Sequence, residues 1–219
     1  MKLGVMQPYF MPYIGYFQLM KAVDKYVVYD DVNYIKGGWV NRNHILINGE
    51  KEMFTVTLKK ASQNKKLMKT LQLNYSKAVN FDQTMTLMKR IISFSDKRLA
   101  AFIANSFREI FSYLSIDTEI LMSSDIPKDN SLRGKDKILQ ICEILGADTY
   151  YNAIGGQNLY DKKEFSEHGI VLNFVDTIPK VYSQLRTKEF VPYLSMIDVL
   201  MNNTKDEVND LLDSFCVRY

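Results

Sequence analysis

The chain has 219 residues, and the 47% that are hydrophobic can bury a large core in one domain or in one domain with a small lobe. Charged residues make up 24% of the chain, with a net charge of only +3. This balance does not suggest a nucleic-acid binder, which usually concentrates basic residues on one face, and ten glycines with five prolines are too few for a fibrous or disordered chain.

A strand, a helix and a second strand are predicted in turn at the start of the chain. Leu3–Met6 has the composition of a short buried strand. After a loop with two prolines, apolar residues recur at helical spacing from Ile14 to Asp24. Lys25–Val32, rich in tyrosine and valine, has the composition of a second strand. This order is that of a βαβ unit, whose two strands are parallel.

A hairpin and two helices are predicted in the middle of the chain. Asn48-Gly49 is a strong signal for a two-residue turn, which would join the predicted strands His44–Ile47 and Met53–Leu58. A polar, lysine-rich stretch follows at 59–69. Two amphipathic helices come next, with their apolar residues at 85–92 and at 99–114.

Strand and helix signals alternate in the rest of the chain. The predicted strands are Thr118–Met122, Asp148–Ile154 and Ile170–Val175, and the predicted helices are Gly134–Leu145, Asp161–Glu167, Leu194–Met201 and Asp206–Phe215. The sequence therefore predicts an α/β fold of Rossmann-like type, with a largely parallel sheet, an inserted β-hairpin and a mainly helical C-terminal part. We expect a single domain over 1–219, with a small hairpin and helical excursion at about 44–115.

The densest functional signal lies between the first strand and the first helix. In open α/β sheets, ligands bind beyond the carboxyl ends of the strands, and a helix N-terminus offers free N–H groups to an anion. We therefore expect five residues of this segment to line a cleft and bind substrate: Gln7, Tyr9, Tyr13, Gly15 and Tyr16. An aromatic loop that only covers the edge of the core is the structural alternative.

The same loop is similar to the nucleotidyltransferase signature. In that superfamily, His-x-Gly-His at the start of a helix contacts triphosphate, whereas this chain has Tyr13-Ile14-Gly15-Tyr16. Tyrosine can donate a hydrogen bond to phosphate but is not cationic near neutral pH. The similarity therefore implies that the original chemistry is altered or lost.

An acidic pair, Asp30 and Asp31, ends the second predicted strand on the same expected ligand side. Adjacent carboxylates can bind Mg²⁺ through its waters or hold an amine. Successive strand residues point to opposite faces, so one ligand need not meet both carboxylates. The structural alternative is that the two aspartates lie in solvent at the strand end and cap the start of a helix.

Donor-rich residues follow the acidic pair. Arg42 suits a two-pronged bond to a carboxylate or phosphate, and it could equally be a surface arginine ahead of the hairpin. We expect Lys36, Asn41 and Asn43 to join Arg42 in substrate binding. Trp39, the only tryptophan, could stack on a base or a sugar, or pack at a rim.

Two weaker signals lie further along the chain. Arg133 and Lys137 flank a helix start, where Ser131 could cap the helix and the basic residues could hold phosphate or carboxylate, or could simply be solvated. Gly155 and Gly156 follow a predicted strand, where they would permit close approach of a ligand or form an ordinary turn.

Ser195 and Asp198 share a helix face one turn apart. They could contact a ligand or cap the helix. Cys142 and Cys216 provide no disulfide framework, and we expect Cys142 to be a small buried hydrophobic residue. The histidines, cysteines and carboxylates do not have the spacing of a zinc site, so no metal site is predicted.

No segment approaches the roughly 18 apolar residues that span a bilayer. The first residues, Met1–Gly4, lead directly into a strand and lack the pattern of a signal peptide. We therefore expect a cytoplasmic protein without a transmembrane segment.

The segment Gly4–Leu46, which contains both clusters described above, resembles the opening of the WbqC-like family. The resemblance extends to Lys137–Ala147, Tyr151–Tyr160 and Phe190–Asp198, so it covers nearly the whole chain. It implies a role in the biosynthesis of O-antigen or another bacterial surface polysaccharide, such as that of lipopolysaccharide. It also implies a transferase that attaches a glycyl-type group to an amino sugar.

Three functions remain open at this point. The first is transfer of an acyl or aminoacyl group to a nucleotide-linked amino sugar, with Asp30, Asp31 and His44 as candidate catalytic residues. Its donor could be activated by ATP with Mg²⁺ or carried as a thioester on an acyl carrier. The second is a glycosyltransferase acting on a nucleotide sugar. The third is a non-catalytic nucleotide or sugar-binding partner of other polysaccharide-biosynthesis enzymes.

Overall fold

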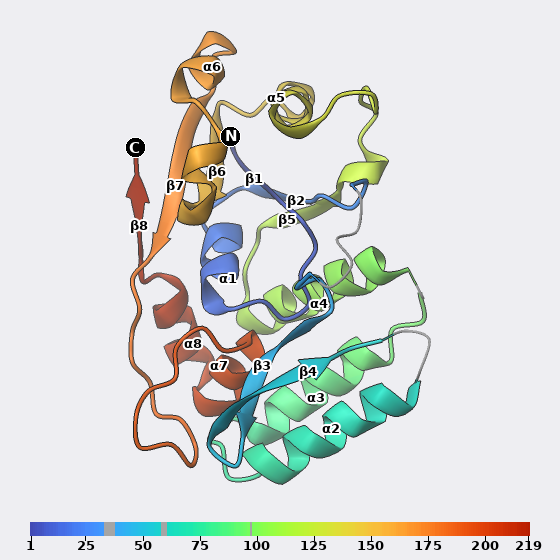
Figure 1. The fold of residues 1–219 in the computed structure, drawn as a ribbon, viewed down its shortest axis with the longest axis vertical. Coiled ribbons are helices and arrows are strands. Elements are labelled where there is room, and N and C mark those ends of the chain that lie inside the picture. Colours follow the sequence, from blue (N-terminus) through green and yellow to red (C-terminus); the bar gives the residue numbers. More distant parts are fainter. Residues whose placement is uncertain (33–37, 58–60, 97) are drawn as a thin grey trace.

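A six-stranded sheet forms the centre of the molecule in a computed structural model that describes residues 1–32, 38–57, 61–96 and 98–219. The strand order is β5-β2-β1-β6-β7-β8 (Figure 1). In chain order these strands are β1 (Lys2–Met6), β2 (Lys25–Val28), β5 (Glu119–Met122), β6 (Thr149–Ala153), β7 (Val171–Thr177) and β8 (Phe215–Arg218).

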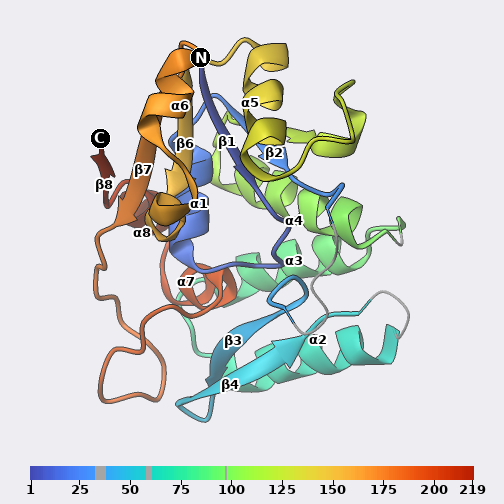
Figure 2. The same cartoon turned by 45° about the horizontal axis from the view of Figure 1, so that its top comes forward.

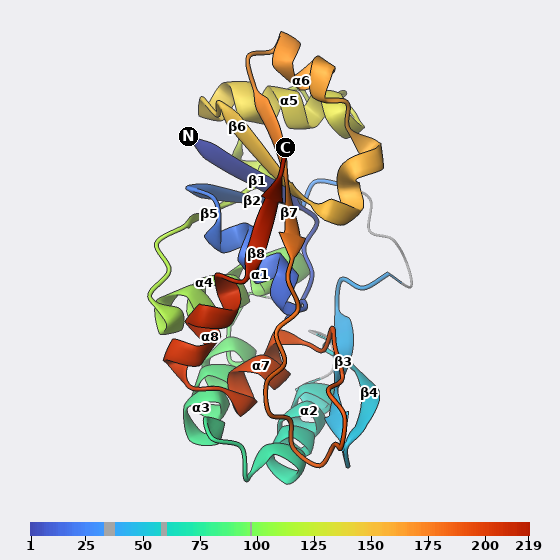
Figure 3. The same cartoon turned by 90° about the vertical axis from the view of Figure 1, so that its left-hand side faces the viewer.

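The sheet is parallel except at one edge. β1 pairs in parallel with β2 and with β6, so that Leu3 lies opposite Lys25 on one side and Tyr150 on the other. β8 runs antiparallel to β7, as the opposed arrows in Figure 3 show. The predicted α/β fold with a largely parallel sheet is therefore confirmed. Chain order reverses across β1, which makes its carboxyl end the place where such sheets bind ligands.

Helices cover both faces of the sheet (Figures 1 and 3). On one face lie α1 (Ile14–Lys21), α4 (Leu99–Leu114) and α8 (Lys205–Leu212), and on the other lie α5 (Gly134–Leu145) and α6 (Lys162–Glu167). Spacings of three and four residues place Phe107, Ile110 and Phe111 on the buried side of α4. Cys142 is fully buried in α5, as predicted.

A β-hairpin with three helices forms the other end of the molecule. β3 (Arg42–Ile47) and β4 (Glu50–Thr55) pack on α2 (Ala61–Tyr75), with α3 (Phe81–Ile92) and α7 (Met196–Asn202) nearby (Figure 2). Asn48 and Gly49 both have positive φ, 53° and 87°, as the predicted two-residue turn requires. The buried residues of the hairpin and of these helices belong to the same hydrophobic cluster as the α1 and α4 face of the sheet.

The long connection from β7 to α7, at 178–195, presses against the tip of this hairpin. A Cβ atom at Gly49 would lie 2.1 Å from the carbonyl oxygen of Arg186, and the Arg186 guanidinium donates to Asn48 Oδ1 at 3.3 Å. Two short 3₁₀ helices, η1 (Ser123–Asp125) and η2 (Ile154–Leu159), follow β5 and β6.

Several elements differ from the prediction, among them β4, which begins at Glu50, three residues before its predicted start. α2 occupies the lysine-rich stretch, because its lysines face solvent while Leu67, Leu71 and Tyr75 are buried along one side. β2 ends at Val28, four residues earlier than predicted. The last helix ends at Leu212, and Phe215–Arg218 pairs with β7 instead of continuing the helix. Among the described residues, no helix combines the length and the apolar character needed to cross a bilayer.

Candidate functional site

Four tyrosines gather at the carboxyl end of β1 and the start of α1, and we call Tyr9, Tyr13, Tyr16 and Tyr193 the tyrosine cluster. Edge-to-face contacts connect them, with ring-centroid distances of 5.6 Å from Tyr9 to Tyr16, 6.2 Å from Tyr13 to Tyr16 and 5.9 Å from Tyr13 to Tyr193. The Tyr16 hydroxyl donates to the carbonyl oxygen of Gln7 at 3.3 Å. The structure thus brings together Gln7 and three predicted tyrosines, and it adds Tyr193, which the sequence analysis missed.

Two residues in or next to the tyrosine cluster have strained backbone conformations. Met11 and Tyr193 have φ values of 46° and 56°, in the left-handed region that costs residues other than glycine ~1–3 kcal/mol each when the surrounding structure imposes it. Two buried donors hold the Met11 carbonyl oxygen: Asn43 Nδ2 at 2.6 Å and Ser195 Oγ at 2.8 Å. Such imposed strain gathers at functional sites, which makes this loop a candidate site.

Gly15 is required by the packing of the tyrosine cluster. A Cβ atom at this position would lie 2.5 Å from Tyr13 Cε2 and 2.5 Å from Thr177 Oγ1. The Tyr13 ring therefore lies directly over the first turn of α1. A side chain at position 15 would displace the Tyr13 ring from this place.

Three members of the tyrosine cluster, Tyr9, Tyr13 and Tyr16, stay neutral over the physiological pH range. Burial raises the pKa of Tyr9, of Tyr13 and of Tyr16, and the neighbouring tyrosines raise each of them further. The phenols therefore act as hydrogen-bond donors and apolar surfaces, and they do not act as anions.

A second group, which we call the lysine cluster, lies at the end of β2 on the α5 side and consists of Asp31, Lys128 and Lys137. The two ammonium groups lie 2.8 Å and 3.0 Å from Asp31 Oδ2, and the lysine side chains are only 1% and 3% exposed. Burial by itself would raise the pKa of Asp31. The contacts with Lys128, Ser123 and Lys137 outweigh burial and lower that pKa to about 2. Lys128 was not among the predicted site residues.

The lysine cluster carries more positive than negative charge, because two cations share one carboxylate. The Lys137 ammonium also lies 5.7 Å from the ring centroid of Tyr29, within the range of a cation–π contact. Burial, then Asp31 and Tyr160, raise the pKa of Tyr29, and Arg133, which is exposed at the start of α5, only partly opposes them. Tyr29 is therefore neutral, and the positive charge at this place comes from the two lysines and Arg133.

Asp30 and Asp31 separate, but strand alternation is not the cause, because β2 ends at Val28 and both residues lie beyond it. Asp30 turns to the end of β5, where it accepts from Ser124 N at 2.9 Å and from Ser124 Oγ at 2.8 Å. Asp31 turns to Lys128 and to α5. The two carboxylates therefore hold different partners.

Each cluster is connected to the end of β1 through one residue. Tyr16 of the tyrosine cluster donates to the Gln7 carbonyl from α1. Tyr29, whose ring lies 5.7 Å from the Lys137 ammonium, donates its backbone N–H to the Met6 carbonyl at 2.8 Å.

Two predicted binding residues at the start of the hairpin, Asn41 and Asn43, have structural partners. Asn43 is buried and holds the Met11 carbonyl. Asn41 donates to the Val56 carbonyl oxygen at 2.9 Å. Lys36, a third predicted binding residue, lies outside the described residues.

Trp39, Arg42 and His44 form a separate group on the hairpin. Trp39 is 51% exposed, with the Arg42 guanidinium 5.7 Å and the His44 ring 5.3 Å from its ring centroid. Arg42 Nε also donates to the Gly38 carbonyl oxygen at 2.9 Å. Burial, and then Lys51, lower the pKa of His44, so its ring is neutral near pH 7.

The remaining predicted residues divide between open and packed positions. Gly155 faces open space in η2, whereas a Cβ atom at Gly156 would lie 2.9 Å from Asn152 Oδ1. Ser195 caps α7, and Asp198 is fully buried, accepting from Tyr75 and Tyr182 at 2.7 Å each. The prediction that Ser131 caps α5 is wrong, because Arg133 takes the N-cap position without a side-chain cap.

The fold and the two clusters define an α/β protein with a mainly parallel sheet and an aromatic and basic candidate site at its topological switch point. The chain belongs to the WbqC-like protein family, whose family model matches residues 7–210. It is also similar to the uncharacterized protein Rv1507c of Mycobacterium tuberculosis, with 27% identity over 219 residues that cover 92% of this chain and 93% of that relative. No solved structure matches the chain significantly.

Proposed function

We propose that the chain is a cytoplasmic enzyme of bacterial surface-polysaccharide biosynthesis, such as that of O-antigen, and that it transfers an acyl or aminoacyl group to the amine of a nucleotide-linked amino sugar. The observation that carries this proposal is the strained loop at the carboxyl end of β1, which Asn43 and Ser195 hold in place beneath the tyrosine cluster. A loop that only covered the core would gain nothing from such strain.

In the proposed complex, the ligand lies across the end of β1. The tyrosine cluster provides neutral donors and flat apolar surfaces on one side, which suit a sugar ring. Arg133 and the surplus charge of the lysine cluster on the other side suit the phosphates of a nucleotide. Gly155, which faces open space, permits close approach of the ligand at the end of β6.

Asp31 does not serve as the base in this proposal. Its carboxylate lies between two buried ammonium groups, and a pKa of about 2 makes it a poor proton acceptor near pH 7. Asp30, which keeps an ordinary serine contact, is the better candidate for holding the sugar amine. The neutral ring of His44 remains a second candidate, from the hairpin side.

The test is a mass-spectrometric search for a new amide. The protein is incubated with UDP-glucosamine and other nucleotide-linked amino sugars, together either with amino acids, ATP and Mg²⁺ or with acyl thioesters. A mass increase of one acyl group on the sugar is expected, and the Asp30→Asn variant should reduce its formation. Absence of a product with every donor would contradict the proposal.

One observation favours a second candidate, a non-catalytic binding partner of other biosynthetic enzymes. The carboxylate closest to the proposed nucleotide side, Asp31, is already ion-paired with lysines. Binding without turnover would then be the outcome. A thermal-shift screen with nucleotide sugars tests whether the protein binds them, which both candidate functions require. A ligand at a hundred times its Kd stabilises the native state by about 2.7 kcal/mol, so binding raises the melting temperature.

A further inference from the structure

Asp198, in the first turn of α7, is a fully buried carboxylate that the proposed function does not use. Its side-chain partners are neutral donors: the Tyr75 hydroxyl to Oδ1 at 2.7 Å, and the Tyr182 hydroxyl and Gln184 Nε2 to Oδ2 at 2.7 Å and 3.1 Å. Burial raises the pKa of Asp198, and these donors oppose the shift. A buried charge is costly unless hydrogen bonds satisfy it, so the groups that Asp198 orients indicate what it holds in place.

Gln184 connects Asp198 to the backbone of the connection at 178–195. Besides its bond to Asp198, Gln184 Nε2 donates to the Val191 carbonyl oxygen at 3.0 Å, and Oε1 accepts from Val191 N at 2.8 Å. The amide can make this two-way contact in only one orientation. The Asp198 carboxylate selects that orientation because it accepts from the Nε2 side. Gln184 therefore holds the connection together across residues 184–191.

The contact at Val191 lies two residues before Tyr193. Pro192 stands between them, and its ring restricts φ to about −65°, so fixing Val191 also restricts the approach of the chain to Tyr193. On the other side of Tyr193, Ser195 Oγ donates to the Met11 carbonyl oxygen at 2.8 Å. Tyr193 is thus anchored from both sides.

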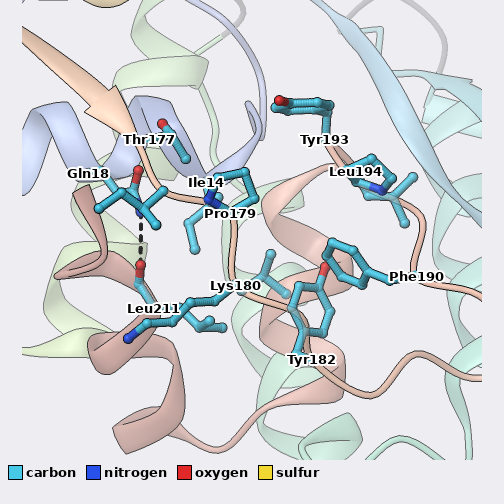
Figure 4. A pocket seen from close by; sticks show the side chains of 13 residues that line it. Ile14, Gln18, Thr177, Pro179, Lys180, Tyr182, Phe190, Tyr193, Leu194 and Leu211 are labelled. Atoms are coloured by element: carbon cyan, nitrogen blue, oxygen red, sulfur yellow. Dashed lines mark hydrogen bonds between the residues drawn. The ribbon is translucent and has the colours of Figure 1, made fainter. Parts of the chain in front are cut away.

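Tyr193 depends on this anchoring more than a core residue would. Its φ of 56° is unfavourable for a residue other than glycine, and its exposed fraction of 61% means that burial contributes little to its placement. Its ring nevertheless contacts that of Tyr13, with the centroids 5.9 Å apart. Figure 4 shows Tyr182 and Phe190 side by side on the same connection, with ring centroids 5.1 Å apart, and Tyr193 further along it.

We propose that Asp198 is a positioning residue of the candidate site, which acts through Gln184 to hold Tyr193 against Tyr13, where the exposed tyrosine stacks on the sugar of a nucleotide-linked substrate. The stacking on a sugar rests on the proposed function, whereas the placement of Tyr193 does not. Asp198 itself touches no ligand, because it is fully buried. Recognition of the sugar therefore depends on a carboxylate that the sugar never meets.

Fluorine NMR of the full chain labelled with 3-fluorotyrosine tests the placement of Tyr193 without a ligand. Tyr193→Phe identifies the resonance. Gln184→Leu removes the hydrogen bonds to Val191 and Asp198, and we expect the Tyr193 resonance to move towards that of a tyrosine in a flexible peptide. Circular dichroism checks that the variant keeps its fold.

The matched control is Lys188→Leu, which introduces the same side chain at an exposed position of the same connection. It lies between Gln184 and Val191 and should leave the Tyr193 resonance where it is. A Tyr193 resonance that stayed unmoved in Gln184→Leu, or that moved equally in both variants, would overturn the proposal.

Asp198→Asn tests the first step of the path. Asparagine keeps the size of the side chain but has one acceptor oxygen where aspartate has two, so it cannot serve all three donors. We expect the Tyr193 resonance to move in the same direction as in Gln184→Leu, by a smaller amount. Combining the two substitutions should produce less than the sum of their effects, because both act on one path. Additive effects would overturn the role of Gln184 as the intermediary.

Isothermal titration calorimetry with UDP-glucosamine measures the consequence for recognition. Gln184→Leu and Tyr193→Ala should each raise the Kd by about three- to tenfold, the size of one aromatic contact. The double variant should bind no more weakly than Tyr193→Ala alone. Binding at the parental affinity by Gln184→Leu, with Tyr193 displaced, would overturn the proposal. Absence of binding by the parent chain would instead contradict the proposed function, and the fluorine spectra would still decide whether Asp198 positions Tyr193.

Discussion

At the scale of single residues, Gly15 decides whether the tyrosine cluster can form. In Gly15→Ala the new methyl group would collide with the Tyr13 ring and with Thr177 Oγ1. We expect a loss of ~1–3 kcal/mol in the free energy of unfolding, as for other overpacked sites, together with weaker binding of UDP-glucosamine. Urea denaturation and calorimetry measure the two effects.

The control for this substitution is Gly155→Ala in η2, compared for stability only. A Cβ atom there would meet no atom within 4 Å, so its unfolding midpoint should stay near that of the parent. An equal loss of stability in both variants would show that the contact with Tyr13 is not the cause.

Asp31 makes the free energy of unfolding depend on pH in the acidic range. Its pKa is lowered from 3.8 in the unfolded chain to about 2 in the folded protein, so the native state binds the proton less tightly. The stabilisation is fully present above about pH 4 and is lost as the pH falls towards 2, with a magnitude of about 2 kcal/mol. Acid titration of the unfolding free energy tests this expectation.

Asp31→Asn should be more damaging near pH 7, by ~3–5 kcal/mol, because it leaves two buried lysines without their carboxylate. Asp30→Asn is the matched variant, since it weakens the hydrogen bonds with Ser124 and leaves the lysine cluster intact. Equal melting temperatures of Asp31→Asn and Asp30→Asn would contradict the stabilising role that the geometry of the lysine cluster indicates.

The sequence indicated which residues could serve the site, but it did not indicate which of them contact one another. The sequence indicated only that one ligand need not meet both Asp30 and Asp31, and the reason given, strand alternation, does not apply because β2 ends at Val28. That Asp31 would meet Lys128 and Lys137 depends on how β5 and α5 pack beside β2, which no local pattern encodes. Tyr193 was missed for the same reason, because it reaches Tyr13 from the far end of the chain.

At the scale of elements, the start of α7 and the loop after β1 depend on one hydroxyl group. Ser195 Oγ accepts from Ile197 N as the helix cap and donates to the strained carbonyl of Met11. Ser195→Ala should therefore cost ~1 kcal/mol as a lost cap and should also relax the loop. We expect weaker binding of UDP-glucosamine in addition to lower stability.

Thr204→Ala provides the comparison, because Thr204 caps α8 in a capping box with Glu207 and donates nothing to the loop. It should lower stability by a similar ~1 kcal/mol while binding stays at the parent value. If Ser195→Ala and Thr204→Ala bound UDP-glucosamine equally well, the loop after β1 would not take part in ligand recognition.

Elements with a clear period were predicted well, and the misses have physical causes. α4 and α5 carry apolar residues at helical spacing and were found. α2 was missed because its polar face is dense in lysine, which conceals the buried row of Leu67, Leu71 and Tyr75. β8 was missed because its pairing with β7 is a tertiary contact that local signals do not show.

At the scale of the whole molecule, the sheet should exchange its amide hydrogens unevenly. β1 has a strand on each side, whereas β8 pairs only with β7 in the described sheet. Hydrogen exchange should therefore be slowest in β1 and its neighbours and fastest in β8, since edge strands open locally at lower free energy. Uniform protection across the sheet would contradict this order.

The two sides of the candidate site should also respond differently to salt. Binding that depends on the exposed Arg133 weakens as ionic strength rises, because exposed charges are screened beyond about 8–10 Å at 0.1–0.15 M salt, whereas the buried lysines of the lysine cluster are screened much less. Contacts with the neutral tyrosines are insensitive to salt. A nucleotide alone should therefore lose more affinity with added salt than the free sugar does.

The single tryptophan offers an optical reporter of the hairpin. Trp39 lies close to both Arg42 and His44, and a protonated imidazole quenches indole fluorescence. Because the pKa of His44 is lowered, emission should dim only once the solution is more acidic than an ordinary histidine requires. Any partner that covers the hairpin would shift that emission and make its arrival visible without a label.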